Sequence, residues 1–161
     1  MPYRTRSRSR SFRGNKDKYS VEHTRVLIST NSTAVNGLNQ AAALVVAPTT
    51  VQGMRKVKHI RISLSPTGEA AGGGQSDVTW ALVYVPEGYN PNNLDGVNEH
   101  SLYEPNQFVM AAGHCDPNAG PIRITSPIAR NLNSGDYIVL IVGTAGQQQI
   151  RGVVEYAITL Q

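Results

Sequence analysis

Polar and apolar residues alternate one by one in the stretch His59-Ile60-Arg61-Ile62-Ser63-Leu64. Side chains of a β-strand point alternately to its two faces, so a period of two predicts a strand with one buried and one solvated face. The same period returns over residues 150–160, where Val154 and Ile158 oppose Glu155. Two such strands are typical of an antiparallel sheet that packs on a core with one face.

The rest of the chain contains further strand patterns, and we expect eight strands in all, at residues 19–30, 42–48, 55–65, 77–86, 107–113, 121–130, 136–144 and 150–160. The fourth and the seventh are apolar on both faces, which indicates strands covered on both sides. Gly, Pro, Asn and Asp residues between the strands predict turns, whereas helical periodicity is scarce. We expect a short helix only at residues 36–44 and a helical turn within residues 87–106. The absence of a βαβ rhythm predicts an all-β fold, an eight-stranded antiparallel jelly roll made of two packed sheets.

In such a jelly roll the first, eighth, third and sixth strands form one sheet, in that order. The residues expected to face the core from this sheet are Ile60, Ile62, Leu64, Ile122, Ile124, Val154 and Ile158. The opposite face then carries a candidate secondary basic patch of Arg25, His59, Arg61, Arg123 and Arg151. The patch would face nucleic acid or another subunit. The alternative is a set of ordinary solvated positions, or of partners for Glu22 and Glu155.

The basic residues are concentrated in the first eighteen positions. Seven of the fifteen Lys and Arg residues lie there against one acid, namely Arg4, Arg6, Arg8, Arg10, Arg13, Lys16 and Lys18. We therefore divide the chain into a basic Arg/Ser-rich arm, residues 1–18, and a shell domain, residues 19–161. Such an arm cannot bury enough apolar surface to fold alone, and its guanidinium groups suit contact with phosphates without base recognition. The alternatives are a solvated tail, a nuclear-import signal, or an Arg-Ser tail whose charge phosphorylation would cancel.

Several classes of function lack their signatures. Cys115 is the only cysteine, so no intrachain disulfide can form. No secretory signal and no membrane-spanning stretch is recognisable, so we expect synthesis inside the cell and no membrane partner. The sequence has no nucleophile elbow, phosphate-binding glycine loop or metalloprotease helix. Adjacent strand residues face opposite sides, so His114-Cys115-Asp116 does not predict a metal or nucleophile site. We expect no enzymatic activity, no cofactor and no bound metal.

Three stretches carry a resemblance to a known family: SLYEPNQFVMAAG (residues 101–113), SPIARNLNSGDYIVL (residues 126–140) and VVEYAI (residues 153–158). With them the chain resembles capsid proteins of small circular single-stranded DNA viruses that encode a replication initiator. The resemblance covers most of residues 20–160, with a basic arm at the position where that family has one. It implies a single jelly roll, a small icosahedral (T=1) shell of sixty copies, and an inward arm that touches packaged DNA.

The resulting expectation is a viral coat protein that assembles with its own copies around single-stranded DNA. The expected location is the virion, and the host nucleus during assembly, with a host nuclear-import receptor as a partner of the arm. Two alternatives stay open: the coat protein of a small satellite RNA virus, and a non-viral nucleic-acid-binding module with an Arg-Ser tail. An enzyme or sugar binder on a jelly roll is disfavoured, because Trp80 is the only tryptophan and no His-rich metal motif is present.

Overall fold

The computed structural model describes residues 19–30, 39–67, 77–89 and 108–160. These residues form nine strands and one short 3₁₀ helix. In chain order they are β1 (Ser20–Thr30), β2 (Asn39–Val46), β3 (Arg55–Thr67), β4 (Val78–Val85), β5 (Val109–Cys115), η1 (Pro117–Ala119), β6 (Ile122–Ser126), β7 (Arg130–Leu132), β8 (Tyr137–Thr144) and β9 (Gln148–Leu160). Within the described part of the chain, no helix combines the length and the apolar character that a membrane span requires.

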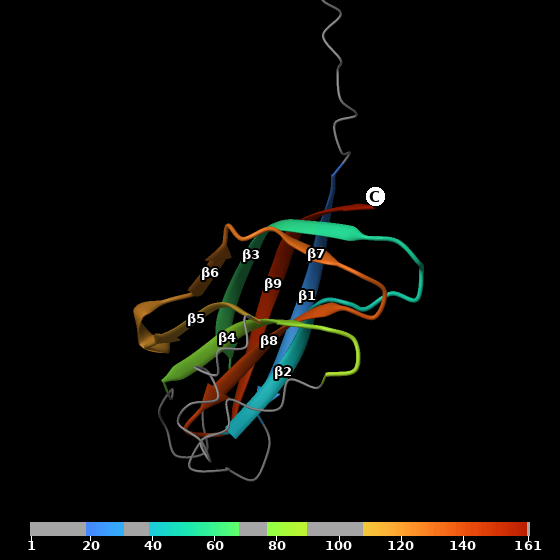
Figure 1. Cartoon of the computed structure of the whole chain (residues 1–161). Coiled ribbons are helices and arrows are strands. Elements are labelled where there is room, and N and C mark those ends of the chain that lie inside the picture. The colour runs from blue at the N-terminus through green and yellow to red at the C-terminus, as the bar shows by residue number, and fades with distance from the viewer. Residues whose placement is uncertain (1–18, 31–38, 68–76, 90–107, 161) are drawn as a thin grey trace, which may run out of the picture.

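The strands form two antiparallel sheets that lie face to face as a sandwich (Figure 1). One sheet has the order β1-β9-β3-β6, with the short β7 also paired to β3, and the other has the order β2-β8-β4-β5. In the view of Figure 1, β3, β9 and β1 lie behind β4, β8 and β2. The eighth strand predicted from the sequence, at residues 150–160, is β9 of the structure. The expected sheet of the first, eighth, third and sixth predicted strands is therefore present as β1-β9-β3-β6.

The main core fills the space between the sheets. The facing predicted for β3 is confirmed, since Ile60, Ile62 and Leu64 are between 0 and 2% exposed. Partners from the same sheet, such as Ile124 and Val154, are equally buried. The opposite sheet contributes Trp80, Leu82, Leu140, Val142 and Met110 to the same cluster. Each of these large apolar side chains stabilises the fold by roughly 1.5–3 kcal/mol relative to an exposed position.

A second apolar cluster lies on the other side of the β2-β8-β4-β5 sheet. Ala81 and Val85 of β4 pack there with Val139 and Ile141 of β8, all of them at most 6% exposed. Strands β4 and β8 are therefore buried on both faces, as their unbroken apolar sequences predicted.

Three expectations about the elements need correction. The single strand expected at residues 121–130 is two strands, β6 and β7, so the described residues contain nine strands rather than eight. Pro127 follows β6 directly, and proline has no N–H to continue a ladder. The helix expected at residues 36–44 is wrong for residues 39–44, which belong to β2 and pair with β8. This pairing overrides the helix propensity of the alanines.

The remaining strand ends differ from the expected ones by a few residues, which is the ordinary uncertainty of such boundaries. The helical turn expected within residues 87–106 falls mostly on positions 90–107, outside the described residues.

The turn before β8 is held by a buried carboxylate. Asp136 is 4% exposed, and its side chain accepts hydrogen bonds from the Tyr84 hydroxyl (2.8 Å), Asn133 N (2.8 Å) and Glu87 N (3.1 Å). Burial, then the hydrogen bond and the negative charge of Asp136, raise the pKa of Tyr84 to about 12, against a smaller lowering effect of Arg130. This network ties the end of β4 to the start of β8.

Candidate nucleic-acid interface

The seven arm residues predicted to bind nucleic acid lie in residues 1–18, outside the described residues, so their role stays a prediction. They are Arg4, Arg6, Arg8, Arg10, Arg13, Lys16 and Lys18. The structure does place the point at which this segment joins the body. Tyr19 directly precedes β1, and Nζ of Lys58 in β3 lies 3.5 Å from the centroid of its ring. The arm is thus attached to the β1-β9-β3-β6 sheet, beside a lysine.

All five residues of the predicted secondary patch are exposed, namely Arg25, His59, Arg61, Arg123 and Arg151. The strand registers bring the four arginines to the outer face, by which we mean the side of the β1-β9-β3-β6 sheet that is turned away from the other sheet. Arg61 lies between the buried Ile60 and Ile62, so it must point outward. Arg123 lies in the same way between Ile122 and Ile124.

His59 occupies a β-bulge. The pairing of β3 with β9 shifts register between Lys58 and Arg61, and His59 has a φ of 55°. A bulge inserts one extra residue into a strand and thereby resets which residues face the core. Val57 is consequently fully buried, whereas Lys56 and Lys58 take outer-face positions opposite Thr159 and Ala157.

Lys56 and Lys58 are not among the residues predicted for the patch, because strict alternation backward from Ile60 turns both of them toward the core. A signal for both lysines is present in the sequence. Two polar residues, Lys58 and His59, stand between the apolar Val57 and Ile60, where strict alternation would place only one. Such a spacing within an alternating strand indicates a bulge.

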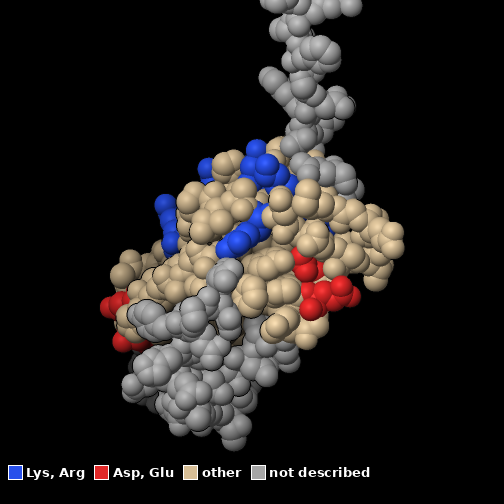
Figure 2. Space-filling model, in the orientation of Figure 1, with Lys and Arg blue, Asp and Glu red and all other residues tan. Residues whose placement is uncertain are grey.

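The outer face therefore carries a large excess of positive charge. Of the eight Lys and Arg residues in the described part of the chain, six lie on it: Arg25, Lys56, Lys58, Arg61, Arg123 and Arg151. Glu155 is the one acid that shares the outer face among the described residues. Figure 2 views the molecule from the side of the other sheet, and the Lys and Arg side chains visible from there lie toward the end of the molecule where β1 begins, apart from the Asp and Glu side chains.

Of the two sheets, only β1-β9-β3-β6 contains Lys, Arg, Asp or Glu residues in its strands. Strands β2, β4, β5 and β8 contain no Lys, Arg, Asp or Glu. A surface with one dominant sign of charge attracts polyanions and raises their local concentration.

The two remaining basic residues act inside the fold. Arg55 is 8% exposed and donates hydrogen bonds to the backbone oxygens of Ala47 (3.0 Å) and Asp136 (3.2 Å). Arg130 lies 5.7 Å from the centroid of the Tyr84 ring. These two cations join the sheets, whereas the six of the outer face are turned to solvent.

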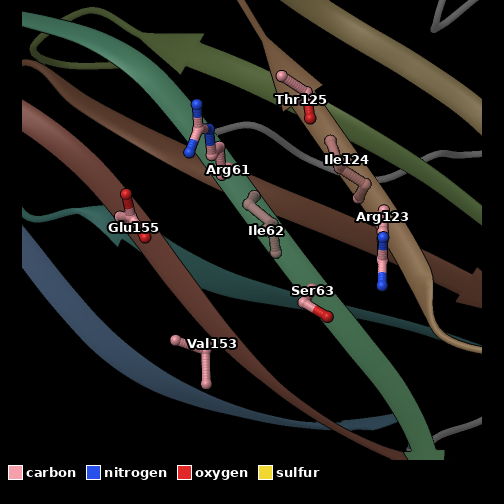
Figure 3. A pocket seen from close by; sticks show the side chains of 8 residues that line it. All are labelled: Arg61, Ile62, Ser63, Arg123, Ile124, Thr125, Val153 and Glu155. Carbon is pink, nitrogen blue, oxygen red and sulfur yellow. The ribbon is translucent and has the colours of Figure 1, made fainter.

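A shallow groove of about 220 Å³ runs across the outer face. Figure 3 shows its lining, which comes from the adjacent strands β6, β3 and β9. The polar lining residues are Arg61, Ser63, Arg123, Thr125 and Glu155, and the apolar ones are Ile62, Ile124 and Val153. The groove thus offers two guanidinium groups and two hydroxyls, all of which can donate hydrogen bonds.

His114 and Cys115 point to opposite sides of β5. His114 is exposed, with Nδ1 3.1 Å from the Thr79 hydroxyl and Nε2 3.6 Å from Asp77, whereas Cys115 packs against the core. No group of three metal-ligating side chains occurs among the residues that the structure describes.

No family model matches the chain, and no curated protein does. Among solved structures, the chain is similar to the BFDV capsid protein in a crystal structure described as decameric. The two share 10% sequence identity at a TM-score of 0.35, over 91% of this chain and 98% of that one.

Proposed function

We propose that this chain is a viral coat protein that assembles into a small icosahedral (T=1) shell of sixty copies and packages single-stranded DNA. The basic arm and the outer face of the β1-β9-β3-β6 sheet would line the inside of that shell. The proposal includes no enzymatic activity. It also includes the virion as the final location, and the host nucleus during assembly, reached through a nuclear-import receptor.

The strand order supports a jelly roll. A jelly roll consists of two packed four-stranded sheets, and its first and last strands are neighbours in one of these sheets. The orders β1-β9-β3-β6 and β2-β8-β4-β5 have this property when β7 is treated as an addition to the sheet of β3. The sequence resemblance of residues 101–113, 126–140 and 153–158 to capsid proteins of circular single-stranded DNA viruses supports the same fold.

The observation that carries the proposal is the basic outer face with the arm attached to it. A protein with one charged and one uncharged sheet has two sides of different chemistry, as a shell around a polyanion requires. Phosphate neutralisation needs no base recognition, which suits a protein that must accept a whole genome.

The charge count favours a combined role of arm and face. Sixty arms of net charge +6 would supply on the order of 360 positive charges, each able to neutralise about one phosphate. The outer face adds six basic side chains and one acid per subunit, which raises the total to about 660. The face therefore contributes nearly as much to the neutralisation of a genome as the arm does.

Neither part distinguishes DNA from RNA by its chemistry alone, so a satellite RNA virus coat protein is the second candidate. A non-viral binding module with an Arg-Ser tail is the third. It would bind nucleic acid equally well without forming closed particles.

The deciding experiment is purification of the expressed full chain, followed by negative-stain microscopy. Uniform closed particles, with an absorbance ratio that indicates nucleic acid, are expected. Digestion of the extracted contents with DNase and with RNase then separates the first two candidates. A protein that stays monomeric at all salt concentrations, while binding nucleic acid, would refute the coat function and favour the binding module.

A further inference from the structure

The groove on the outer face has an ordered arrangement of donors. In the pairing of β3 with β6, Arg61 lies opposite Thr125 and Ser63 lies opposite Arg123. Each cross-strand pair thus joins one arginine to one hydroxyl, and the two arginines stand on a diagonal. Directly paired residues lie ≈ 4.5–5.5 Å apart and diagonal ones about 7–8 Å, a distance that two long arginine side chains can bridge.

Such an arrangement fits a phosphodiester. Its two unesterified oxygens accept hydrogen bonds only, and the guanidinium group of arginine matches phosphate geometry with two parallel donors. The hydroxyls of Ser63 and Thr125 add two donors on the same surface.

The remaining wall of the groove suits the rest of a nucleotide. Val153 of β9 is 46% exposed and lies opposite Ser63 on one side and Arg25 on the other. An exposed valine beside cations offers an apolar contact to a sugar or to an unstacked base. A duplex keeps its bases stacked inside, so contact between Val153 and a base is available only to a single strand.

Glu155 is the acidic residue among those that line the groove. It lies opposite Arg61 in the pairing of β3 with β9, and its carboxylate is 3.8 Å from Nδ1 of His23. Glu155 lines the same groove as the two arginines, so its carboxylate would repel a phosphate held there and weaken binding.

We propose that the groove between β6, β3 and β9 is a subsite for one nucleotide of a single strand. Arg61 and Arg123 hold the phosphodiester, Val153 contacts the sugar or base, and Glu155 limits the affinity. This inference rests on the proposed nucleic-acid function, and it assigns that function a defined place on the body of the protein in addition to the arm.

The test compares two double variants of the full chain that lose the same charge from the same face. In one, Arg61→Gln and Arg123→Gln remove the groove cations. In the other, Arg25→Gln and Arg151→Gln remove cations that do not line the groove. Binding of a fluorescent tetranucleotide of thymidylate is measured over a range of salt, with thermal melting to verify folding. The arm is identical in both variants, so its contribution cancels.

For the groove variant we expect at least a ten-fold loss of affinity, and a log–log salt slope shallower by about 1.4, since each lost contact with single-stranded DNA removes about 0.7. The matched variant should lose about three-fold or less, as expected of charges that act at a distance. Equal losses in the two variants, or no loss in either, would overturn the subsite.

Glu155→Gln gives an independent test of opposite sign. Removal of the repelling charge should tighten tetranucleotide binding about two- to five-fold, the range typical of exposed charge interactions. The matched control is Glu22→Gln, since Glu22 pairs with Tyr156 and stands on the opposite side of the sheet. Weaker binding by the Glu155 variant would contradict the role assigned to it.

The two proposals can fail separately. Closed particles together with equal losses in the double variants would remove the subsite and leave the coat function. Absence of particles together with a selective loss in the groove variant would remove the coat function and leave the subsite.

Discussion

Ile62 and Ser63 are neighbours in β3 with opposite environments. Ile62 is 2% exposed and belongs to the core, whereas Ser63 is exposed on the outer face. We expect Ile62→Asp to prevent folding, because it buries a charge without a partner. The matched variant Ser63→Asp should fold, with a free energy of unfolding within about 0.5 kcal/mol of the natural chain. Circular dichroism and urea titration check both, and a normally folded Ile62 variant would refute the facing of β3.

A second residue-scale prediction concerns Tyr84, whose pKa is raised from 10.0 to about 12. Above pH 10 the unfolded chain loses the phenol proton while the folded protein keeps it, so stability falls as pH rises. The contribution is fully present below pH 10 and is lost as the pH passes about 12. Tyr84→Phe should cost about 1 kcal/mol at neutral pH, through the lost hydrogen bond to Asp136.

The measurement is the free energy of unfolding by urea between pH 8 and pH 12. The Tyr84→Phe curve should fall less steeply above pH 10 than that of the natural chain. Tyr89→Phe is the control, because that residue is 65% exposed. If the two variants have the same alkaline slope, the network around Asp136 does not act as described.

At the scale of the elements, the bulge in β3 decides how much charge the outer face carries. His59 holds a φ of 55°, in the left-handed region that glycine adopts without strain. We expect His59→Gly to stabilise the protein by about 0.5–1 kcal/mol, as relief of backbone strain exceeds the entropic cost of glycine. His59→Val should destabilise it, because β-branched residues avoid this conformation. Urea midpoints for the two variants measure the difference, and equal midpoints would show that the bulge is unstrained.

The same bulge marks the limit of what the sequence could predict about the elements. Alternation over residues 59–64 is a local signal, so it correctly predicted which face of β3 is buried. Strict alternation alone does not reach Lys56 and Lys58 beyond the bulge. The polar pair Lys58-His59 is a sequence signal for an extra residue, but the pairing of β3 with β9 fixes where that residue lies. The helix prediction for the alanines of β2 was wrong for a related reason, because their pairing with β8 decides their conformation.

For the candidate site, the sequence predicted the outward arginines Arg25, Arg61, Arg123 and Arg151 once a strand order was assumed. The groove itself could not be predicted from the sequence. It depends on the register that sets Arg61 opposite Thr125 and Glu155, and registers between strands distant in sequence are not encoded in any local pattern.

At the scale of the whole molecule, the chain has two cationic parts, the arm of residues 1–18 and the outer face, and Tyr19 is the first described residue after the arm. Deletion of residues 2–18 removes only the first, so the sandwich should still fold and, under our proposal, still form closed particles. These particles should hold less nucleic acid but not none, because six basic side chains per subunit remain on the face.

Combining the deletion with Arg61→Gln and Arg123→Gln should lower the remaining nucleic acid further, and by more than the loss of the same charge outside the groove does. The absorbance ratio of purified particles and their sedimentation measure the contents, and microscopy verifies closure. The deletion joined to Arg25→Gln and Arg151→Gln is the matched control for charge outside the groove. If the arm-deleted chain is unfolded and monomeric, the arm belongs to the folding unit and the division at residue 18 is wrong. If its particles are as full as those of the natural chain, the face alone suffices and the arm serves another purpose, such as nuclear import.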